Sequence, residues 1–530
     1  MSERDTLQRL HKALLNLNKR AERTANEILV SNFVDSEPLF DLLATPNNQV
    51  IYGRRGTGKT HALKYLENSV KNKGDTAVYL DLRSIGSNTS IYNDGTRSLA
   101  DRASTLIIDV LNALHDGFYE LAVVAVDRAP NPAQITGRLD DLAHAISAIR
   151  ISGAIEQEQN TGSTRSLKDR ISAKISGSPT TFSGELSLSN SGETEDRSSM
   201  RTKRSGSETV YIDFANVGTS ITGLAGVLGS RRIWLLIDEW SEIPIELQPY
   251  LADLLRRTIL PVSSITVKIA SIEHRLRFIL IQDQGQYVGL ELGADISADL
   301  NLDDFLVFDN DQEKAVEFFR NLIFKHYQSE DPNSADSGIQ SSDQLVRVAF
   351  TQSPAFTEFV RAAEGVPRDA LNLIAKVVTK SFGRKIAMSD IRAAARDWYQ
   401  QDKASSILGN PGLHAVLDYV VDSVIGERRA RAFLFPTATR DAAIEQLFDA
   451  RLLHILKKNV SSRDEPGARY DVYKIDYGCY VELANTTWMP KGLFGDEFLD
   501  SLVKETEVPW DDYRSIRRAI LRPENIPRPT

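Results

Sequence analysis

A glycine-rich segment between a short apolar run and a helical pattern constrains this 530-residue chain more than any other feature. Residues 53–60 read GRRGTGKT, which matches G-x-x-x-x-G-K-[ST], the phosphate-binding loop. Residues 49–52 are typical of a buried strand that runs into such a loop, and residues 61–66 are typical of the helix that leaves it. Loop N–H groups and the positive end of the helix dipole would both face a phosphate. The sequence therefore predicts an α/β fold that binds a nucleoside triphosphate.

This loop provides the first set of candidate site residues. We expect Lys59 to reach the β- and γ-phosphates and the Thr60 hydroxyl to ligate Mg²⁺, because the last two positions of the motif have these roles. The predicted nucleotide-binding residues run without a break from the first glycine to the histidine after the motif: Gly53, Arg54, Arg55, Gly56, Thr57, Gly58, Lys59, Thr60 and His61. The predicted cofactors are ATP and Mg²⁺.

An acidic pair provides the second part of the predicted site. Residues 233–237 are five apolar residues that lead into Asp238 and Glu239, about 180 residues after the loop. An aspartate at the C-terminal end of a buried strand can hold Mg²⁺ opposite Thr60, and a glutamate after it can orient and deprotonate the attacking water. We therefore predict Thr60 and Asp238 as metal ligands, Glu239 as the general base, and ATP hydrolysis as the reaction.

Two more polar residues complete the predicted catalytic set with Lys59 and Glu239. Ser271 ends the predicted strand 265–272 and would hydrogen-bond the attacking water or the γ-phosphate; the alternative is an ordinary turn residue. Residues 365–368 read GVPR and open a helix, with Pro367 at a favoured first-turn position. Arg368 would then project from the helix start towards phosphate and distinguish ATP from ADP. The alternative for Arg368 is an exposed position at an ordinary helix start.

Composition indicates a globular chain with several domains. Hydrophobic residues make up 42% and charged residues 25% of the sequence, and the length exceeds what one core supports. There is no run of 18 apolar residues, and the first residues lack the layout of a signal peptide, so we expect no membrane partner and a cytoplasmic location. The single cysteine, Cys479, excludes an internal disulfide, and residues 476–481 around it look like a strand.

The order of patterns predicts five regions. Residues 1–47 are helical, residues 48–310 form a parallel-sheet core, residues 311–404 form a helical lid, residues 405–485 form a further domain, and residues 486–530 form a basic tail. The expected core strands are 49–52, 76–82, 232–239, 265–272 and 305–308. The Ser/Thr-rich segment 156–209 interrupts the core. Its period-2 apolar runs favour a β-containing insertion, with a disordered loop as the alternative.

The segment 405–485 looks like a winged-helix domain, because two predicted helices, 413–421 and 439–448, precede two predicted strands, 453–457 and 470–477. Winged helices can place a helix in the DNA major groove. Residues 427–474 contain ten Arg or Lys and seven Asp or Glu, a slight basic excess, but the candidate reading helix carries acidic residues. The overall charge of −9 argues against coating of nucleic acid by the whole surface. Duplex DNA and a protein therefore stay open as partners of this domain.

Four motifs in this order resemble AAA+ ATPases of the origin-recognition-complex type, related bacterial forms of which occur in mobile elements and anti-phage defence. The motifs are GRRGTGKT, LLIDE, KIASIEHR and EGVPRDALNLI. The resemblance implies a sheet of order 5-1-4-3-2, a lid that carries Arg368, nucleotide between core and lid, a winged helix after the lid, and ATP-dependent homo-oligomers.

One part of the family pattern is missing. The family usually supplies an arginine to a neighbouring subunit's ATP from the region before the fifth strand, and residues 293–300 contain none. The substitutes are Arg256 and Arg257, or Arg275 and Arg277. This departure weakens the expectation of a ring that activates its subunits in trans.

Two functions follow from these observations. The first is an ATP-binding and ATP-hydrolysing AAA+ switch that assembles on, or recruits, DNA or a partner protein. The second is a signal-transducing NTPase of an anti-phage defence system, whose winged helix binds protein rather than DNA. A nuclease or other effector has little support, because the sequence shows no metal cluster or nucleophile triad outside the predicted ATP site.

Overall fold

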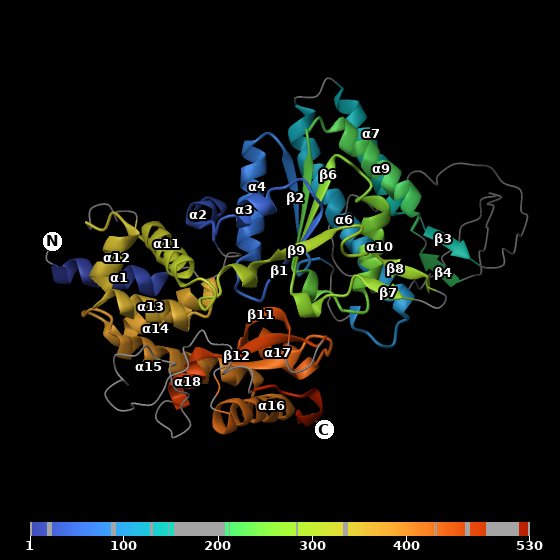
Figure 1. Cartoon of the computed structure of the whole chain (residues 1–530). Coiled ribbons are helices and arrows are strands. Elements are labelled where there is room, and N and C mark those ends of the chain that lie inside the picture. The colour runs from blue at the N-terminus through green and yellow to red at the C-terminus, as the bar shows by residue number, and fades with distance from the viewer. Residues whose placement is uncertain are drawn as a thin grey trace, which may run out of the picture. The chain divides into compact units, whose positions relative to one another are not determined.

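The structure is a computed structural model of the whole chain (Figure 1). It describes residues 3–17, 24–85, 92–127, 131–147, 149–152, 207–210, 212–281, 285–331, 338–428, 430, 432–461, 467–483 and 519–527. The chain forms two compact units, one of residues 1–143 with 214–530 and one of residues 144–213. Among the described residues, no helix is both long and apolar enough to cross a membrane.

A five-stranded parallel sheet forms the centre of the first unit. Its strands are β1 (Gln49–Tyr52), β2 (Thr76–Asp81), β5 (Ile233–Asp238), β6 (Ile265–Ser271) and β9 (Ser297–Asn301). They lie in the order β2-β5-β6-β1-β9, which is 5-1-4-3-2 when these strands alone are counted along the chain. β1, β5 and β6 are buried along their whole length, as expected for central strands covered on both faces.

The fifth strand differs from the one that the sequence predicts. Residues 305–308 end a short 3-10 helix, Leu302–Phe305, and continue as loop and turn, whereas the strand beside β1 is Ser297–Asn301. The sequence of this strand, SADLN, is largely polar because it lies at the sheet edge, where only its last residues are buried. Of the apolar run FLVF, Phe305 packs against the core beside α4, Val307 against the C-terminal sheet, and Phe308 in the hydrophobic core of the lid.

Helices cover both faces of the sheet, as Figure 1 shows. On one side, α4 (Lys59–Asn72) packs its apolar face with the short helices α2 (Asn26–Asn32) and α3 (Leu39–Leu43). On the other side lie α6 (Leu99–Val126), α9 (Phe214–Val227) and α10 (Gln248–Thr258), together with α7 (Pro132–Ile146). A hairpin of β7 (Ile279–Ile281) and β8 (Tyr287–Gly289) packs on α10. These layers fix β1 and β5 in the middle of the core.

The lid is helical, as predicted. It consists of α11 (Gln312–Glu330), α12 (Ser342–Ala349), α13 (Ser353–Ala362), α14 (Pro367–Ser381) and α15 (Met388–Trp398). The first helix of the chain, α1 (Glu3–Asn16), buries Leu10 and Leu14 in the same hydrophobic core. The N-terminal segment is therefore divided: α1 packs on the lid, whereas α2 contacts both α4 of the core and α11 of the lid.

The C-terminal region combines helices with a three-stranded antiparallel sheet. Its elements are α16 (Pro411–Val421), β10 (Ala432–Pro436), α17 (Ala442–Asp449), β11 (Leu453–Ser461), β12 (Arg469–Ile475) and α18 (Tyr477–Leu483), with sheet order β10-β12-β11. The expected strand at 476–481 is wrong, because these residues form the start of α18, where Cys479 is buried. This region shares one hydrophobic core with the lid.

Two predicted segments fall mainly outside the described residues. Of the insertion 156–209, the described part is β4 (Ser207–Val210), which pairs antiparallel with β3 (Ile149–Ser152) in the second unit. Of the tail 486–530, the described part is 519–527, and Ile520 forms a bridge with Leu434 of β10. The rest of the predicted basic tail lies outside the described residues.

Candidate nucleotide site

The phosphate-binding loop joins the buried strand β1 to the N-terminus of α4, as the sequence predicts. Gly56 and Gly58 have φ values of 95° and 99°, a left-handed conformation that L side chains rarely adopt. A Cβ atom on Gly56 would also lie 3.0 Å from the Cβ of Arg368. The loop therefore needs glycine both for its own curvature and for the close approach of the lid.

Lys59 begins α4 and is buried inside the loop. Its Nζ donates to the carbonyl oxygens of Gly53 at 2.8 Å and Arg54 at 3.1 Å. Burial lowers the pKa of the Lys59 ammonium, against the opposing attraction of Glu239 and Asp238. The carbonyl oxygens therefore hold the ammonium group at the N-terminus of α4, where phosphate oxygens would contact it.

Thr60 and Asp238 form the predicted metal pair. The Thr60 hydroxyl donates to Oδ2 of Asp238 at 2.7 Å, and the Tyr79 hydroxyl donates to the same oxygen at 2.7 Å. The other carboxylate oxygen accepts the backbone N–H of Glu239 at 2.8 Å. Two adjacent oxygen donors from the protein suit Mg²⁺, which usually keeps its other positions for water and phosphate. The residues present therefore fit this ion.

Glu239 follows Asp238 at the end of β5, with its backbone in the left-handed region at φ 57°. This conformation is uncommon for a residue other than glycine and is often found at functional sites. Burial raises the pKa of the Glu239 carboxyl, and the neighbouring Asp238 adds to the shift. Arg83 Nη1 lies 3.6 Å from Glu239 Oε1 and is also paired with Asp81.

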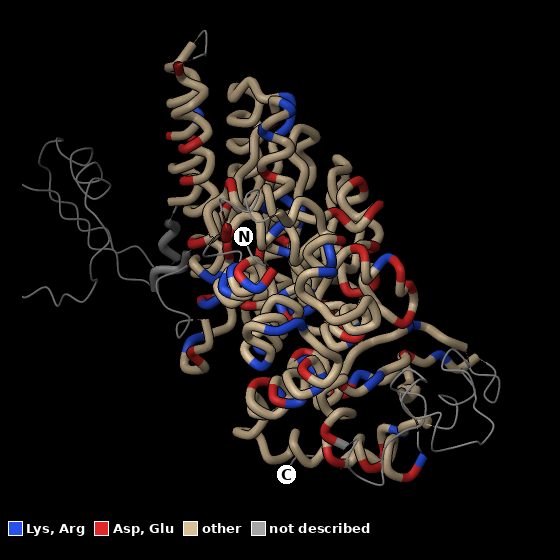
Figure 2. The backbone as a smooth tube through the Cα atoms, turned by 90° about the vertical axis from the view of Figure 1, so that its left-hand side faces the viewer, with Lys and Arg blue, Asp and Glu red and all other residues tan. Residues whose placement is uncertain are grey.

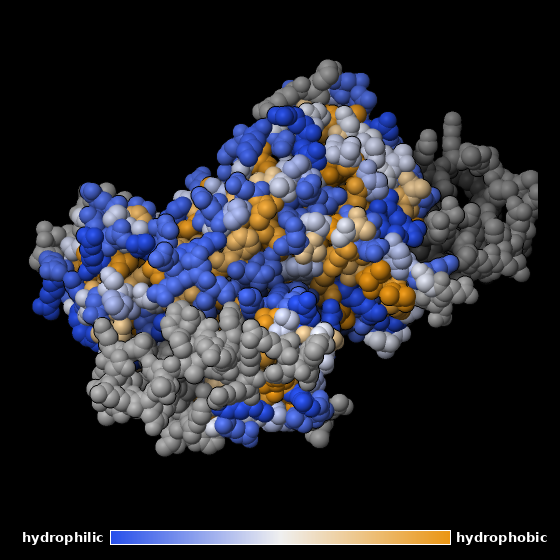
Figure 3. All heavy atoms as spheres, in the orientation of Figure 1, coloured by the Kyte–Doolittle hydropathy of each residue, from blue (hydrophilic) through white to orange (hydrophobic). Residues whose placement is uncertain are grey.

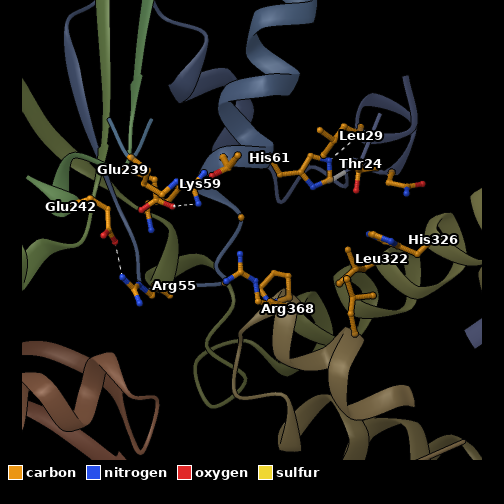
Figure 4. A pocket seen from close by; sticks show the side chains of 17 residues that line it. Thr24, Leu29, Arg55, Lys59, His61, Glu239, Glu242, Leu322, His326 and Arg368 are labelled. Atoms are coloured by element: carbon orange, nitrogen blue, oxygen red, sulfur yellow. Dashed lines mark hydrogen bonds and ion pairs between the residues drawn. The ribbon is translucent and has the colours of Figure 1, made fainter. Parts of the chain in front are cut away.

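Arg368 brings the lid to the loop. It is the second residue of α14, after Pro367, and its backbone N–H donates to the carbonyl oxygen of Gly56 at 3.2 Å. Figure 4 shows Lys59, Glu239 and Arg368 pointing into the same space from three different elements. The structure therefore brings together Glu239, Lys59 and Arg368, which the sequence predicted separately.

A cavity of about 390 Å³ contains these groups. The residues that line it on the phosphate side are Arg55, Gly56, Gly58, Lys59, Thr60, Arg83, Glu239, Glu242, Pro367 and Arg368. Of the other predicted site residues, His61 lines the opposite end, while Gly53, Thr57 and Asp238 lie behind the lining. The side chain of Arg55 pairs with Glu242 at 2.6 Å.

Ser271 and Arg54 are placed differently from the rest of the predicted site. Ser271 is fully buried at the end of β6, 3.0 Å from the Ser241 hydroxyl, and does not line the cavity. Arg54 turns away from the cavity: its backbone N–H and its Nε both donate to Asp303, at 2.8 and 2.7 Å. Its guanidinium continues into the C-terminal region, against His454. This placement does not support a phosphate contact from the Arg54 side chain.

The end of the cavity where the predicted residue His61 lies also contains residues that the sequence did not indicate. They come from the N-terminal segment and the lid: Thr24, Leu29, Asn32, Leu322, His326 and Leu371. These six residues and His61 are called the base end of the cavity. His61 Nε2 lies 2.6 Å from the Leu29 carbonyl oxygen, and burial lowers the pKa of this imidazole. Burial also lowers the pKa of His326 to about 4. Burial thus favours the neutral form of both rings, and Leu29, Leu322 and Leu371 supply the apolar part of this end (Figure 4).

Asn32 is the most informative of these groups. Its side chain is 3% exposed, and its Nδ2 donates to the Ser329 hydroxyl at 3.0 Å. That hydroxyl gives its single proton to the His326 carbonyl at 3.0 Å, so it must accept from Asn32, which fixes the amide orientation. Oδ1 of Asn32 is then a buried acceptor without a hydrogen-bond partner among the described residues.

The substitutes for the missing arginine are engaged within the chain. Arg256 and Arg257 both pair with Asp253 at 2.8 Å, and Arg275 pairs with Asp449 of α17 at 2.5 Å. Arg277 Nε donates to the Ile279 carbonyl at 3.4 Å. Arg275 and Arg277 lie in the segment that leads into the β7–β8 hairpin. Figure 3 shows hydrophobic side chains around this hairpin, where Ile281 is 72% exposed.

One family model matches the part of the chain that contains the phosphate-binding loop. Residues 17–86, which contain α2, α3, β1, the phosphate-binding loop, α4 and β2, match the ORC-CDC6-like family model. A search of curated proteins found no match.

Two solved structures similar to this chain are of archaeal proteins. The Walker-type ATPase PABY2304 of Pyrococcus abyssi has a TM-score of 0.40 and 13% identity, over 89% of this chain and 100% of that chain. The ORC1 protein of Aeropyrum pernix in complex with DNA has a TM-score of 0.32 and 13% identity, over 90% of this chain and 98% of that chain. The family match over residues 17–86 thus makes this part of the core similar to ORC/Cdc6-type AAA+ ATPases.

Proposed function

We propose that this protein is a Mg²⁺-dependent ATPase of the AAA+ type that works as a molecular switch. The observation that carries the proposal is the convergence of Lys59, Thr60, Glu239 and Arg368 on one cavity, with Asp238 hydrogen-bonded to Thr60. Lys59 binds the β- and γ-phosphates, and the backbone N–H groups of the loop surround them. Mg²⁺ held by Thr60 and Asp238 would neutralise charge on the phosphate oxygens.

Glu239 is the general base of this reaction. Burial raises its pKa, so the carboxylate is a better proton acceptor than an exposed glutamate. Arg368 contacts the γ-phosphate from the lid and stabilises the charge that develops during its transfer. Loss of the γ-phosphate removes that contact, and the lid then responds to hydrolysis. Ser271 acts indirectly in this scheme, through Ser241 and the backbone after β6.

The base end favours adenine as the base. The buried Oδ1 of Asn32 needs a donor, and the exocyclic amine of adenine provides one, whereas guanine carries an acceptor at the same ring position. His61 and His326, both neutral, and the leucines supply an apolar surround for the ring. Asn32 is therefore the residue that we assign to selection of ATP over GTP.

We infer that the C-terminal region is the output of the switch and that its partner is a protein rather than DNA. If this region is a winged helix, α17 is its reading helix, and two acidic residues of α17 are engaged by the core: Asp449 by Arg275, and Glu445 by His274 at 3.7 Å. Figure 2 shows acidic and basic residues interspersed along this part of the backbone rather than a basic stripe. Duplex DNA would require release of α17 from the core, which makes DNA-dependent assembly the second candidate.

The test is a comparison of Glu239→Gln with Glu242→Gln. Both glutamates line the cavity, but Glu242 pairs with Arg55 and has no assigned role in proton transfer. We expect Glu239→Gln to bind ATP with Mg²⁺ as the wild type does and to lose turnover by about a thousandfold. Glu242→Gln should keep most of its turnover. Equal turnover of wild type and Glu239→Gln in a phosphate-release assay would remove the proposed base.

A further inference from the structure

The phosphate-binding loop is attached to the C-terminal region through one arginine. Arg54 is 4% exposed, although it lies in a loop that faces a nucleotide cavity. Its Nε donates to Asp303, its Nη1 lies 2.9 Å from Nδ1 of His454, and its guanidinium lies 4.6 Å above the ring of Phe448. His454 is the second residue of β11, 400 positions along the chain. The loop is therefore anchored by Asp303, His454 and Phe448, which are far from it in the sequence.

His454 continues this contact as a neutral group. Arg54 can only donate, so Nδ1 of His454 must accept, and the ring proton is on Nε2, which lies 3.1 Å from Oδ2 of Asp476. Burial lowers the pKa of His454 well below its ordinary value, and the nearby cations Arg54 and Lys403 lower it further. His454 thus accepts a hydrogen bond from Arg54 of the loop and donates one to Asp476.

The chain of contacts then returns to the lid. Lys403 Nζ lies 2.5 Å from Asp476 and 3.3 Å from Oδ2 of Asp369, and Arg451 pairs with the other oxygen of Asp369. Asp369 directly follows Arg368 in α14. The network contains three cations, Arg54, Lys403 and Arg451, and three carboxylates, Asp303, Asp476 and Asp369, so its charges balance.

Both ends of the network touch groups of the nucleotide site. At one end, the carbonyl oxygen of Arg54 accepts Lys59 Nζ at 3.1 Å and the Thr57 hydroxyl at 2.9 Å. At the other end, the backbone N–H of Arg368 donates to Gly56 O. A network needed only for stability would have no reason to end twice at the same loop.

We propose that Arg54, His454 and Asp476 are positioning residues, through which the docked C-terminal region holds the phosphate-binding loop in its nucleotide-accepting shape. The inference rests on the proposed ATPase function and goes beyond it, because it makes ATP affinity depend on a side chain of β11. Occupancy of the loop and docking of the C-terminal region are then linked, and each strengthens the other.

The test measures affinity for a non-hydrolysable ATP analogue with Mg²⁺ by titration calorimetry on the full-length chain. His454→Ala and Arg54→Ala should each weaken binding about tenfold, and the double variant should bind no more weakly than Arg54→Ala, because both substitutions break the same contact. His454→Asn places an acceptor near the position of Nδ1 and should recover most of the affinity, whereas His454→Gln should not. If His454→Ala does not fold, the Asn and Gln pair gives the same comparison.

Two controls separate this inference from its alternatives. Leu434→Ala removes buried apolar contacts of β10 away from the network, so it should lower the melting temperature and leave affinity unchanged. Affinity lost equally in Leu434→Ala and His454→Ala would overturn the positioning role in favour of general destabilisation, and additive effects of Arg54→Ala and His454→Ala would overturn it as well. Lys59→Ala reports on the ATP site itself. If it binds like the wild type, the proposed function fails, whereas weak binding by Lys59→Ala with full binding by His454→Ala rejects only the network.

Discussion

The two ends of the nucleotide cavity are built in different ways. The phosphate end is assembled from consecutive residues of one loop, from the end of β5 and from the start of α14, and its groups are charged. The base end is assembled from α2, α4, α11 and α14, and its groups are neutral. Phosphate binding demands a backbone conformation that only certain sequences adopt, so it leaves a motif. Base recognition needs only an apolar slot and one or two fixed polar atoms, which many packings supply.

The largest expected effect is the loss of ATP affinity in Lys59→Ala, which changes the phosphate end alone. Lys59→Ala removes a buried cation that faces the phosphates and should weaken binding of ATP and GTP alike by tenfold to a hundredfold, about 1.5–3 kcal/mol for hydrogen bonds to charged groups. Fluorescence titration with both nucleotides measures this. A change in the ATP-to-GTP ratio would show that the ends are not independent.

The lid arginine should have the next largest effect, and on a different quantity. Arg368→Ala is expected to lower turnover about tenfold or more while changing ATP affinity by less, because the charge it stabilises develops during transfer of the γ-phosphate. Arg368→Lys keeps the charge but loses the planar guanidinium, so it should recover part of the turnover. Steady-state kinetics measure kcat and KM separately. An increase in KM with kcat unchanged would make Arg368 a binding residue only.

Asn32 tests the base end by itself. Asn32→Leu keeps a similar volume but removes the acceptor, and we expect the preference for ATP over GTP to fall about tenfold while the affinity for inorganic triphosphate stays constant. Ser329→Ala serves as a matched control, because it releases the amide orientation without removing Oδ1. If Asn32→Leu keeps the wild-type preference for ATP over GTP, Asn32 does not select the base, and backbone groups would have to do so.

The pH dependence should be the smallest difference between the ends. Glu239 must be ionised to accept a proton, and its pKa is raised in the folded protein, so turnover should fall as pH drops through a value above the ordinary 4.5. His326, with a pKa near 4, stays neutral above that value, and His61 is also shifted downward by burial. The ATP-to-GTP preference should therefore show no step near pH 6.5, where free histidine titrates. A step in the preference near pH 6.5 would contradict the buried state of these rings.

The parts of the fold that the sequence predicted correctly are those whose local pattern matches one structural demand. The loop, the fully buried β5 and β6 and the helical lid belong here. β9 was missed because an edge strand carries polar residues and gives no apolar run, whereas residues 305–308 are apolar for a different reason. Residues 477–483 form a helix that is buried on nearly all sides, so its sequence has no helical stripe to detect.

The site follows the same division. The roles predicted for Lys59, Thr60, Asp238 and Glu239 follow from position in a motif, and these residues lie near one another in the structure. Arg54 belongs to the same motif, but its side-chain direction depends on Asp303 and His454, which are distant in sequence. Asn32 and His326 are 294 positions apart and meet only because α2 packs on α11. No local pattern reports such meetings, which require the tertiary structure.

The order of strands in the core sheet has a consequence for how the protein is made. β1 and β2 leave the ribosome first, but the partners of both strands in the sheet, β5, β6 and β9, are encoded after the segment 144–213. β3 pairs with β4, so the chain returns from that segment to where it left, and the entropy of closing the interruption grows only slowly with its length. The part of the nascent chain before this segment must therefore wait without its sheet neighbours until β5 and β6 have been synthesised. The exposed strands β1 and β2 are then the part of the protein most in need of a chaperone during translation.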